Sequence, residues 1–343
     1  MSRCLREGDF IESTEGLIFD VKGLVHPPDR VVAFVRYIPD NHGTRERNGK
    51  RYRKIYDLGD RYEFLKTHYP EYVVYDNVFD EEMSEVPIDR VLRVYQPLEK
   101  TRALIISRSR TSLEQKTLEM IISLSEASGV AVENFGVSGS ILVGLSGPSS
   151  DIDLIVYGSE QSCRVKNALM ELLSEGNSFC RYGESTLRRI YDERHRETGV
   201  SFEEFSYSET RKSFQGLFKG TDFFVRYVKS WSEVEETYGS VRYRNIGIAE
   251  VEGVIGDDRG AHFTPCLYTL NNVKILYGPR VGPLTEIVSF RGRFCEHATS
   301  GECIRARGKV ESKMVDDKIN YRLVLGNTRR DYMVVSEKHR LTR

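Results

Sequence analysis

Two aspartates stand at the start of an otherwise apolar segment, residues 151–158 (DIDLIVYG), and this feature constrains the fold most. Side chains alternate between the two faces of a β-strand. Asp151 and Asp153 therefore project from one face, while Ile152, Leu154 and Val156 face the other way, into a core. Neighbouring carboxylates repel one another and are stable together mainly when a cation lies between them, and hard oxygen ligands suit Mg²⁺. The segment predicts a buried strand that presents a divalent-cation site.

A glycine turn precedes this strand in residues 135–140 (FGVSGS). Gly139 permits a tight turn and close approach of the backbone, and Ser140 suits the N-cap of a short helix over residues 141–145. Backbone amides at a helix terminus, together with the helix dipole, form an anion site. A phosphate site beside a Mg²⁺ site predicts a bound nucleoside polyphosphate, as phosphoryl or nucleotidyl transfer requires.

Gly139-Ser140, a gap of ten residues and the Asp151-Ile152-Asp153 strand resemble the signature of the DNA polymerase β-like nucleotidyltransferase superfamily. The resemblance extends over residues 135–158, and the order of elements predicted over 101–240 gives it weaker support. It implies an enzyme that transfers a nucleoside monophosphate from a Mg²⁺-bound nucleoside triphosphate, such as ATP, to an acceptor hydroxyl and releases pyrophosphate. Asp151 and Asp153 would hold two metal ions.

The resemblance also implies a third carboxylate on an adjacent strand. Asp222 is the first candidate, because it opens the apolar strand predicted over 221–228, and it would complete the metal site and accept the acceptor's proton. Other candidates for this third carboxylate are Asp192, Glu203 and Glu204.

The same resemblance gives roles to residues that would contact the triphosphate. Gly139 and Ser140 would bind its β- and γ-phosphates, and Arg211 and Lys212 would neutralise its charge. Solvent-facing positions for these two cations are the alternative, as they are for Lys219 and Arg226. The residues after Ser140 are apolar, where many members of the superfamily carry polar or basic groups. A family-shaped domain that has lost catalysis and binds nucleotide or nucleic acid is therefore a second interpretation.

Along the chain, the pattern predicts an α+β protein of several domains. Residues 1–97 form an N-terminal α+β domain of unknown role, 98–240 a nucleotidyltransferase domain with a mixed sheet and helices, and 241–343 a small, basic, all-β barrel. Asn48-Gly49 is a strong hairpin signal. Ser112 with Gln115 resembles a capping box. Helices are predicted over 59–67, 98–109, 112–128, 160–175 and 185–214, and strands over 16–26, 30–38, 72–79, 151–158 and 221–228.

A run of basic residues surrounds the predicted hairpin over 44–54, with Tyr52 among them. Such a run is either a phosphate-binding and stacking surface or a solvated hairpin tip, and the pattern favours the tip. Its cations are Arg45, Arg47, Lys50, Arg51, Arg53 and Lys54.

The C-terminal third is basic, with 18 Lys and Arg against 12 Asp and Glu, whereas the whole chain has a net charge of −1. Basic residues recur at every second position there, so each set would project from one face of its strand. A basic face on a small barrel predicts binding of a polynucleotide, with RNA as the acceptor, although a solvent-facing sheet would look the same. The candidate contacts are Arg291, Arg293, Arg305, Arg307 and Lys309, with Phe294 for stacking.

No apolar run approaches the ~18 residues of a membrane span, and the N-terminus carries charges where a signal peptide needs apolar residues. We therefore expect a cytoplasmic protein without a membrane partner. The six cysteines form no CxxC pair and match no common zinc module, which favours reduced thiols without a structural metal.

Overall fold

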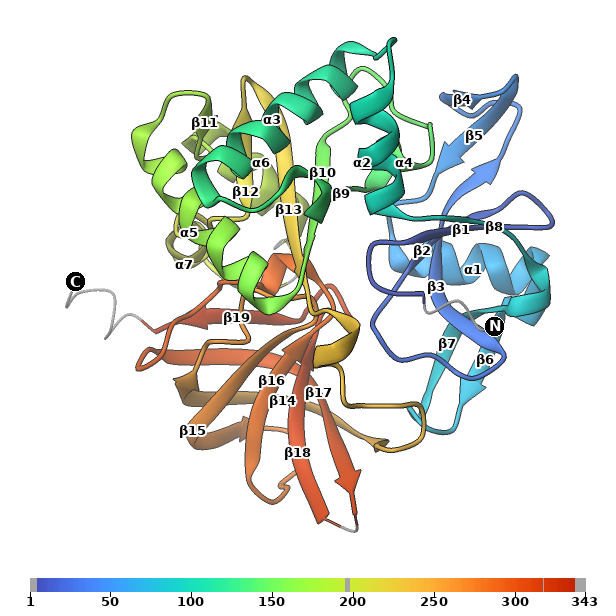
Figure 1. Ribbon diagram of the computed structural model, residues 1–343. Helices are drawn as coiled ribbons and strands as arrows, with labels where there is room; N and C mark the ends of the chain where they lie inside the picture. The colour runs from blue at the N-terminus through green and yellow to red at the C-terminus, as the bar shows by residue number, and fades with distance from the viewer. Residues whose placement is uncertain (1–4, 195–197, 317, 337–343) are drawn as a thin grey trace. The chain divides into compact units, whose positions relative to one another are not determined.

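The computed structural model describes residues 5–194, 198–316 and 318–336 (Figure 1). This part of the chain contains seven α-helices and three β-sheets, so the predicted mixture of helices and strands is confirmed. The chain separates into two compact units. The first consists of Met1–Asn77, Glu81–Phe179 and Phe214–Tyr238, and the second of Val78–Asp80, Cys180–Ser213 and Gly239–Arg343. Within the described residues, no helix has the length and apolar character needed to cross a membrane.

The first unit contains an eight-stranded N-terminal sheet. Asn48 and Gly49 have φ angles of 52° and 74° and join two of its strands as the predicted hairpin. A helix, α1 (Leu58–His68), follows the hairpin and confirms the prediction for 59–67. The strands are β1 (Phe10–Ser13), β2 (Ile18–Val21), β3 (Arg30–Pro39), β4 (Arg45–Arg47), β5 (Lys50–Lys54), β6 (Val73–Asp76), β7 (Glu81–Pro87) and β8 (Val91–Tyr95). Their order is β4-β5-β3-β2-β1-β8, and β7 pairs with β3 and β6.

A five-stranded mixed sheet follows, formed by β9 (Phe135–Val137), β10 (Ile152–Tyr157), β11 (Phe179–Cys180), β12 (Gln215–Phe218) and β13 (Thr221–Val228) in the order β11-β12-β13-β10-β9. The two longest strands, β10 and β13, are parallel, and both were predicted. The helices of this region are α2 (Pro97–Ile106), α3 (Ser112–Ser128), α4 (Gly139–Leu142) and α5 (Ser159–Glu175). The capping box of α3 is formed by Thr111 and Glu114, so the predicted Ser112–Gln115 box was wrong by one residue.

The second unit contains α6 (Glu184–Arg194), α7 (Phe202–Glu209) and a six-stranded sheet. Residues 195–197 of the predicted helical stretch lie outside the described residues. β14 pairs with both β15 and β17, so the sheet curls back on itself, which supports the predicted all-β C-terminal region. The strands are β14 (Arg242–Asp257), β15 (Cys266–Tyr277), β16 (Leu284–Ser289), β17 (Cys303–Val315), β18 (Lys318–Leu325) and β19 (Tyr332–Val335).

Candidate functional site

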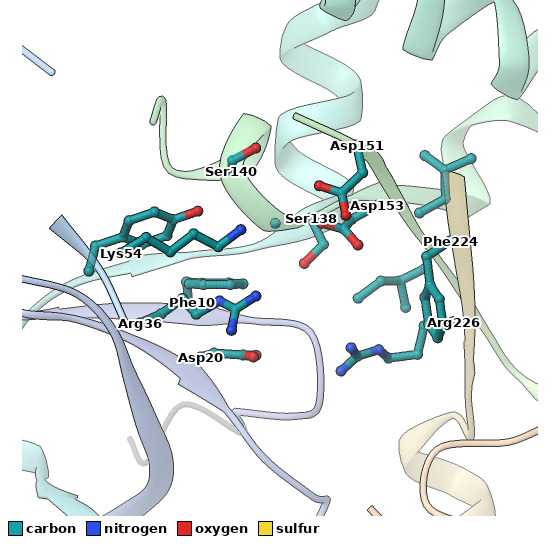
Figure 2. Close-up of a pocket in the computed structure, with 14 residues that line it drawn as sticks. Phe10, Asp20, Arg36, Lys54, Ser138, Ser140, Asp151, Asp153, Phe224 and Arg226 are labelled. Carbon is teal, nitrogen blue, oxygen red and sulfur yellow. The ribbon is translucent and has the colours of Figure 1, made fainter. Parts of the chain in front are cut away.

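A pocket in the first unit brings together the glycine turn, the start of β10, β13 and the N-terminal sheet. Its cavity measures about 80 Å³, several times the ~10–15 Å³ that one buried water needs. Carboxylates and cations both line it, as Figure 2 shows. The carboxylates are Asp20, Asp151 and Asp153, and the cations are Arg36, Lys54 and Arg226.

The aspartate pair lies together at this pocket, as the alternation of the strand predicts. Asp153 lies on β10, and Asp151 stands directly before that strand. Burial and the charge of Asp151 raise the pKa of Asp153 above its ordinary value, although nearby cations oppose the shift. A carboxylate whose ionisation is disfavoured by burial and by a neighbouring carboxylate is stabilised by a bound cation. This electrostatic arrangement fits a metal site.

Glycine is required at position 139 by the backbone conformation of the turn and by its close approach to Asp153. Its φ of +58° lies in the left-handed region, and a Cβ added there would lie 1.9 Å from Oδ2 of Asp153 and 2.8 Å from its Cγ. The backbone N–H of Ser138 also donates a hydrogen bond of 2.9 Å to the carbonyl oxygen of Asp153. The turn therefore contacts the aspartate directly, and this contact requires glycine.

Ser140 differs from its predicted role. The N-cap of α4 is Ser138, and Ser140 lies inside the helix, because the helix begins two residues earlier than predicted. Its side chain is 4% exposed and lines the pocket. Within the described residues its hydroxyl has no hydrogen-bond partner. A buried hydroxyl without a partner is rare in proteins and marks a place where a ligand or water can bind.

The apolar residues after Ser140 have a structural reason. Leu142 and Val143 belong to a core cluster that also contains Tyr37 and Tyr52 of the N-terminal sheet. In addition, Nη1 of Arg47 donates a hydrogen bond of 3.1 Å to the carbonyl oxygen of Val143. These residues therefore hold the turn against the N-terminal sheet.

The hairpin cations are only partly solvated, so the interpretation of a solvated tip was wrong for half of them. Arg47 is held at the turn, and Arg45 donates a hydrogen bond of 3.0 Å to Oγ of Ser150. Lys54 lines the pocket. Only Lys50, Arg51 and Arg53 are exposed.

Lys54 and Arg36 are half-buried cations that the sequence reasoning did not assign to the site. In the described part of the chain, neither side chain forms a hydrogen bond or an ion pair. Their nearest aromatic contact is the ring of Tyr56, whose centroid is 4.8 Å from Nζ of Lys54 and 5.8 Å from Cζ of Arg36. Burial and the charge of Arg36 lower the pKa of Lys54 to about 8.

Arg226 and Asp20 are charged residues of the pocket that do have partners. Arg226 forms an ion pair with Glu7, and Asp20 lies 2.7 Å from Nζ of Lys22. Burial opposes ionisation of Asp20, but the charges of Lys22 and Arg226 outweigh it and hold its pKa below the ordinary value. Asp20 was missed because no local spacing relates β2 to the aspartate pair.

Asp222 is not among the residues that line the pocket, although it lies on the same face of β13 as Phe224 and Arg226, which do, and its role stays a prediction. The Cα partner of Asp153 on β13 is Phe224, and Asp222 is exposed at the start of that strand, opposite Leu217 of β12. The other candidates for a third carboxylate, Asp192, Glu203 and Glu204, belong to the second unit.

The donor set nevertheless fits a nucleotide-bound metal. No group of three or more His, Cys, Asp or Glu residues is placed to hold a metal ion among the residues described. Mg²⁺ is commonly bound through one or two carboxylates, with substrate phosphates and water completing its octahedron. Asp151 and Asp153, beside the unpartnered hydroxyl of Ser140, provide that arrangement.

Arg211 and Lys212 have other partners in the second unit, and neither lines the pocket. Nη1 of Arg211 lies 2.7 Å from Oε1 of Glu302. Lys212 is 1% exposed, forms an ion pair with Glu209 and donates a hydrogen bond to the carbonyl oxygen of Arg293. Buried cations need such partners, which explains why these two residues face protein groups.

The predicted basic face of β17 is smaller than expected. Arg305 and Arg307 alternate on the strand and are partly exposed. Lys309 is 4% exposed, and its Nζ lies 2.6 Å from Oε1 of Glu311. Its exposure was predicted wrongly: Lys309 lies on the same face of β17 as the buried Glu311, which also pairs with Arg322 of β18.

The second basic pair does not lie on a strand. Gly292–Phe294 forms a 3₁₀ turn, so Arg291 and Arg293 do not share a strand face as predicted. Phe294 is 2% exposed and therefore offers no ring for a base to stack on. Burial lowers the pKa of Arg293 to about 10, with further contributions from Arg194 and Arg291.

Comparison with known proteins places the chain in a family. No protein-family model matches it, and no solved structure matches it. The uncharacterized protein MJ1086 from Methanocaldococcus jannaschii is 32% identical over 335 residues, which cover 95% of this chain and 96% of the relative. The similarity therefore extends over nearly the whole length of both proteins. This chain belongs to the family of the uncharacterized protein MJ1086.

Proposed function

We propose that this protein is a nucleotidyltransferase. It would move a nucleoside monophosphate from a Mg²⁺-bound nucleoside triphosphate to an acceptor hydroxyl and release pyrophosphate. One observation carries the proposal: Asp151 and Asp153 share a pocket with a turn whose Gly139 touches Asp153 and whose Ser140 hydroxyl lacks a partner. Paired carboxylates beside a phosphate-binding turn suit a metal–triphosphate substrate.

Some residues of the pocket would bind the metal, and others would bind the phosphates. Asp151 and Asp153 would hold the metal, and Mg²⁺ bound there supplies charge stabilisation for the phosphates and for the attacking oxygen. The hydroxyl of Ser140 would donate a hydrogen bond to a phosphate oxygen. Gly139 allows the turn to lie against the aspartate, which keeps the phosphate and metal sites adjacent.

The proposed reaction is an in-line displacement at the α-phosphorus. The acceptor oxygen forms a bond to this phosphorus, and the bond from the phosphorus to the oxygen that bridges to the β-phosphate breaks. Pyrophosphate leaves with the electron pair of that bond, and the hydroxyl proton passes to solvent water. The chain's own contribution is to orient the triphosphate and to stabilise its charge.

The acceptor is a separate part of the proposal. RNA is one candidate class, and Arg305 and Arg307 are the predicted contacts that retain partial exposure on β17. The second interpretation, a non-catalytic nucleic-acid-binding protein, relies on the same surface. It has less support, because Lys309 and Phe294 are buried whereas the aspartate pair lies at the pocket.

Thermal unfolding with each of the four ribonucleoside triphosphates, with and without Mg²⁺, tests the proposal. Ligand at 100 times its dissociation constant stabilises by about 2.7 kcal/mol, which is several degrees for a unit of this size. The wild type should show a stabilisation that depends on Mg²⁺: the shift with Mg²⁺ and a triphosphate together should exceed the shift with either alone. Asp153→Asn should lose this stabilisation, and Asp222→Asn, which changes an exposed aspartate on β13, should keep it.

Two results would contradict this account. Equal stabilisation of Asp153→Asn and the wild type would exclude Asp153 as a metal ligand. Loss of stabilisation in Asp222→Asn would return Asp222 to the role that the family resemblance implies.

A further inference from the structure

Arg36 and Lys54 are half-buried cations that line the pocket, and no carboxylate pairs with either of them in the described part of the chain. Three other half-buried cations of this region have acidic partners within 4 Å, and a fourth, Arg45, donates a hydrogen bond to the hydroxyl of Ser150. Those ion pairs are Lys22 with Asp20 at 2.7 Å, Arg47 with Glu12 at 2.8 Å, and Arg30 with Glu85 at 3.4 Å. Each of these four cations thus has a protein partner, whereas Arg36 and Lys54 have neither an ion pair nor a hydrogen bond among the described residues.

The backbone turns both side chains toward the same pocket. Tyr37 lies opposite Lys54 on the neighbouring strand, so these two residues share a face. In a regular strand Arg36 would face away from Tyr37, because neighbouring residues point to opposite faces. However, Ile18 of β2 pairs with Tyr37 and Phe19 pairs with Val35, so β3 carries one extra, unpaired residue at Arg36. Such a bulge re-aims a side chain and is frequent beside active sites. Arg36, Tyr37 and Lys54 consequently all line the pocket.

Two unpaired cations in one half-buried pocket repel each other and lose hydration. The mutual effect is visible in Lys54, whose pKa is lowered by burial and by the charge of Arg36. A polyanion bound between them would relieve both penalties. Figure 2 shows Lys54 and Arg36 reaching in from the N-terminal sheet, while Asp153 belongs to β10 and Asp151 directly precedes that strand. The pocket therefore has a cationic side and a metal-binding side.

We propose that Arg36 and Lys54 bind the β- and γ-phosphates of the substrate, so that the N-terminal sheet is the polyphosphate-recognition element of the enzyme. This inference rests on the proposed function and gives residues 1–97 a role in it. The two cations take the place that the sequence assigned to Arg211 and Lys212. They also stabilise the charge that the pyrophosphate gains as it leaves.

Inorganic tripolyphosphate is the appropriate probe, because it carries the phosphates without a base and cannot undergo nucleotidyl transfer. Its dissociation constant would be measured by titration calorimetry at pH 7 and low salt. The variants are Arg36→Met, Lys54→Met and, as a matched control, Lys50→Met, which changes an exposed lysine on the same strand as Lys54. Loss of one charge-assisted contact should weaken binding at least about tenfold, and the double variant should not bind measurably. Lys50→Met should bind like the wild type.

The conservative variants Arg36→Lys and Lys54→Arg keep the charge and should retain most of the binding, which excludes a general folding defect. Absence of tripolyphosphate binding by the wild type would overturn the inference, as would unchanged binding by Arg36→Met and Lys54→Met. The result is separate from the proposed function. Asp153→Asn should still bind tripolyphosphate without Mg²⁺, so a failure of the catalytic proposal would leave the phosphate-binding result intact.

Discussion

Replacement of Gly139 by alanine tests the geometry at the centre of the site. The substitution adds one methyl group at a residue with a φ of +58°, and that group would lie 1.9 Å from Oδ2 and 3.0 Å from Cβ of Asp153. The side chain of Asp153 cannot keep its position, because real Cβ atoms do not approach other atoms so closely. We therefore expect Gly139→Ala to lower both stability and metal-dependent nucleotide binding.

The magnitude follows from two contributions. A non-glycine residue in the left-handed region costs roughly 1–2 kcal/mol, and overpacking in a filled site costs roughly 1–3 kcal/mol. Together they predict a loss of about 2–5 kcal/mol, or about 5–15 °C for a unit of some 200 residues. Gly176→Ala is the matched control. Gly176 has a φ of +69° with no atom near an added Cβ, so only the backbone contribution of about 1–2 kcal/mol applies.

Chemical denaturation of four proteins separates these contributions: wild type, Gly139→Ala, Asp153→Ala and the double variant. Removing the Asp153 carboxylate deletes the two closest contacts of the new methyl group. In the Asp153→Ala background, Gly139→Ala should lower the free energy of unfolding by no more than Gly176→Ala does in the wild type. The coupling energy between positions 139 and 153 should therefore be at least about 1 kcal/mol. If Gly139→Ala is as stable as Gly176→Ala in the wild-type background and keeps its Mg²⁺-dependent nucleotide binding, the contact between turn and aspartate is not real.

Three further predictions follow from the charges. At pH values above the raised pKa of Asp153, Asp153→Asn should increase the free energy of unfolding of the metal-free protein. This increase should vanish at lower pH, where the wild-type carboxyl is protonated, and chemical denaturation at pH 8 and pH 4 checks both expectations. The affinity for tripolyphosphate should be highest below pH 8, where Lys54 is protonated, and should fall above pH 8 as Lys54 loses its proton. The Lys54→Arg variant should show no such fall between pH 7 and 9. Glu209→Gln should destabilise the second unit by about 3 kcal/mol, because it removes the carboxylate that pairs with the buried Lys212. It should leave nucleotide binding unchanged, as unfolding with and without Mg²⁺–triphosphate would show.

Local signals in the sequence predicted the elements that carry the aspartate pair. Alternation placed Asp151 and Asp153 on one face, and the strands at 151–158 and 221–228 lie where expected. Glycine at position 139 is required by the turn, as its conformational freedom suggested. These features depend on neighbours within a few residues, which is why the sequence alone reveals them.

The other side of the pocket depends on tertiary packing and could not be predicted. Arg36 reaches the site through a β-bulge, and Lys54 through the packing of its sheet against the turn, so no spacing relates either residue to β10. Asp222 was chosen for its position at the mouth of a strand; the register places Phe224 beside Asp153, and the role of Asp222 stays a prediction. Lys309 had the alternation of a surface residue, yet it is buried and forms an ion pair with the buried Glu311.

The central claim is that the aspartate pair supports transfer of a nucleoside monophosphate. The most direct measurement incubates the protein and Mg²⁺ with each nucleoside triphosphate, labelled at either the α- or the γ-phosphate, and with cell extract as the source of acceptor. The account predicts that label enters an acceptor from the α-labelled nucleotide only, with release of pyrophosphate, and that Asp153→Asn abolishes this transfer. Transfer of the γ-label, or α-label transfer that persists in Asp153→Asn, would contradict it.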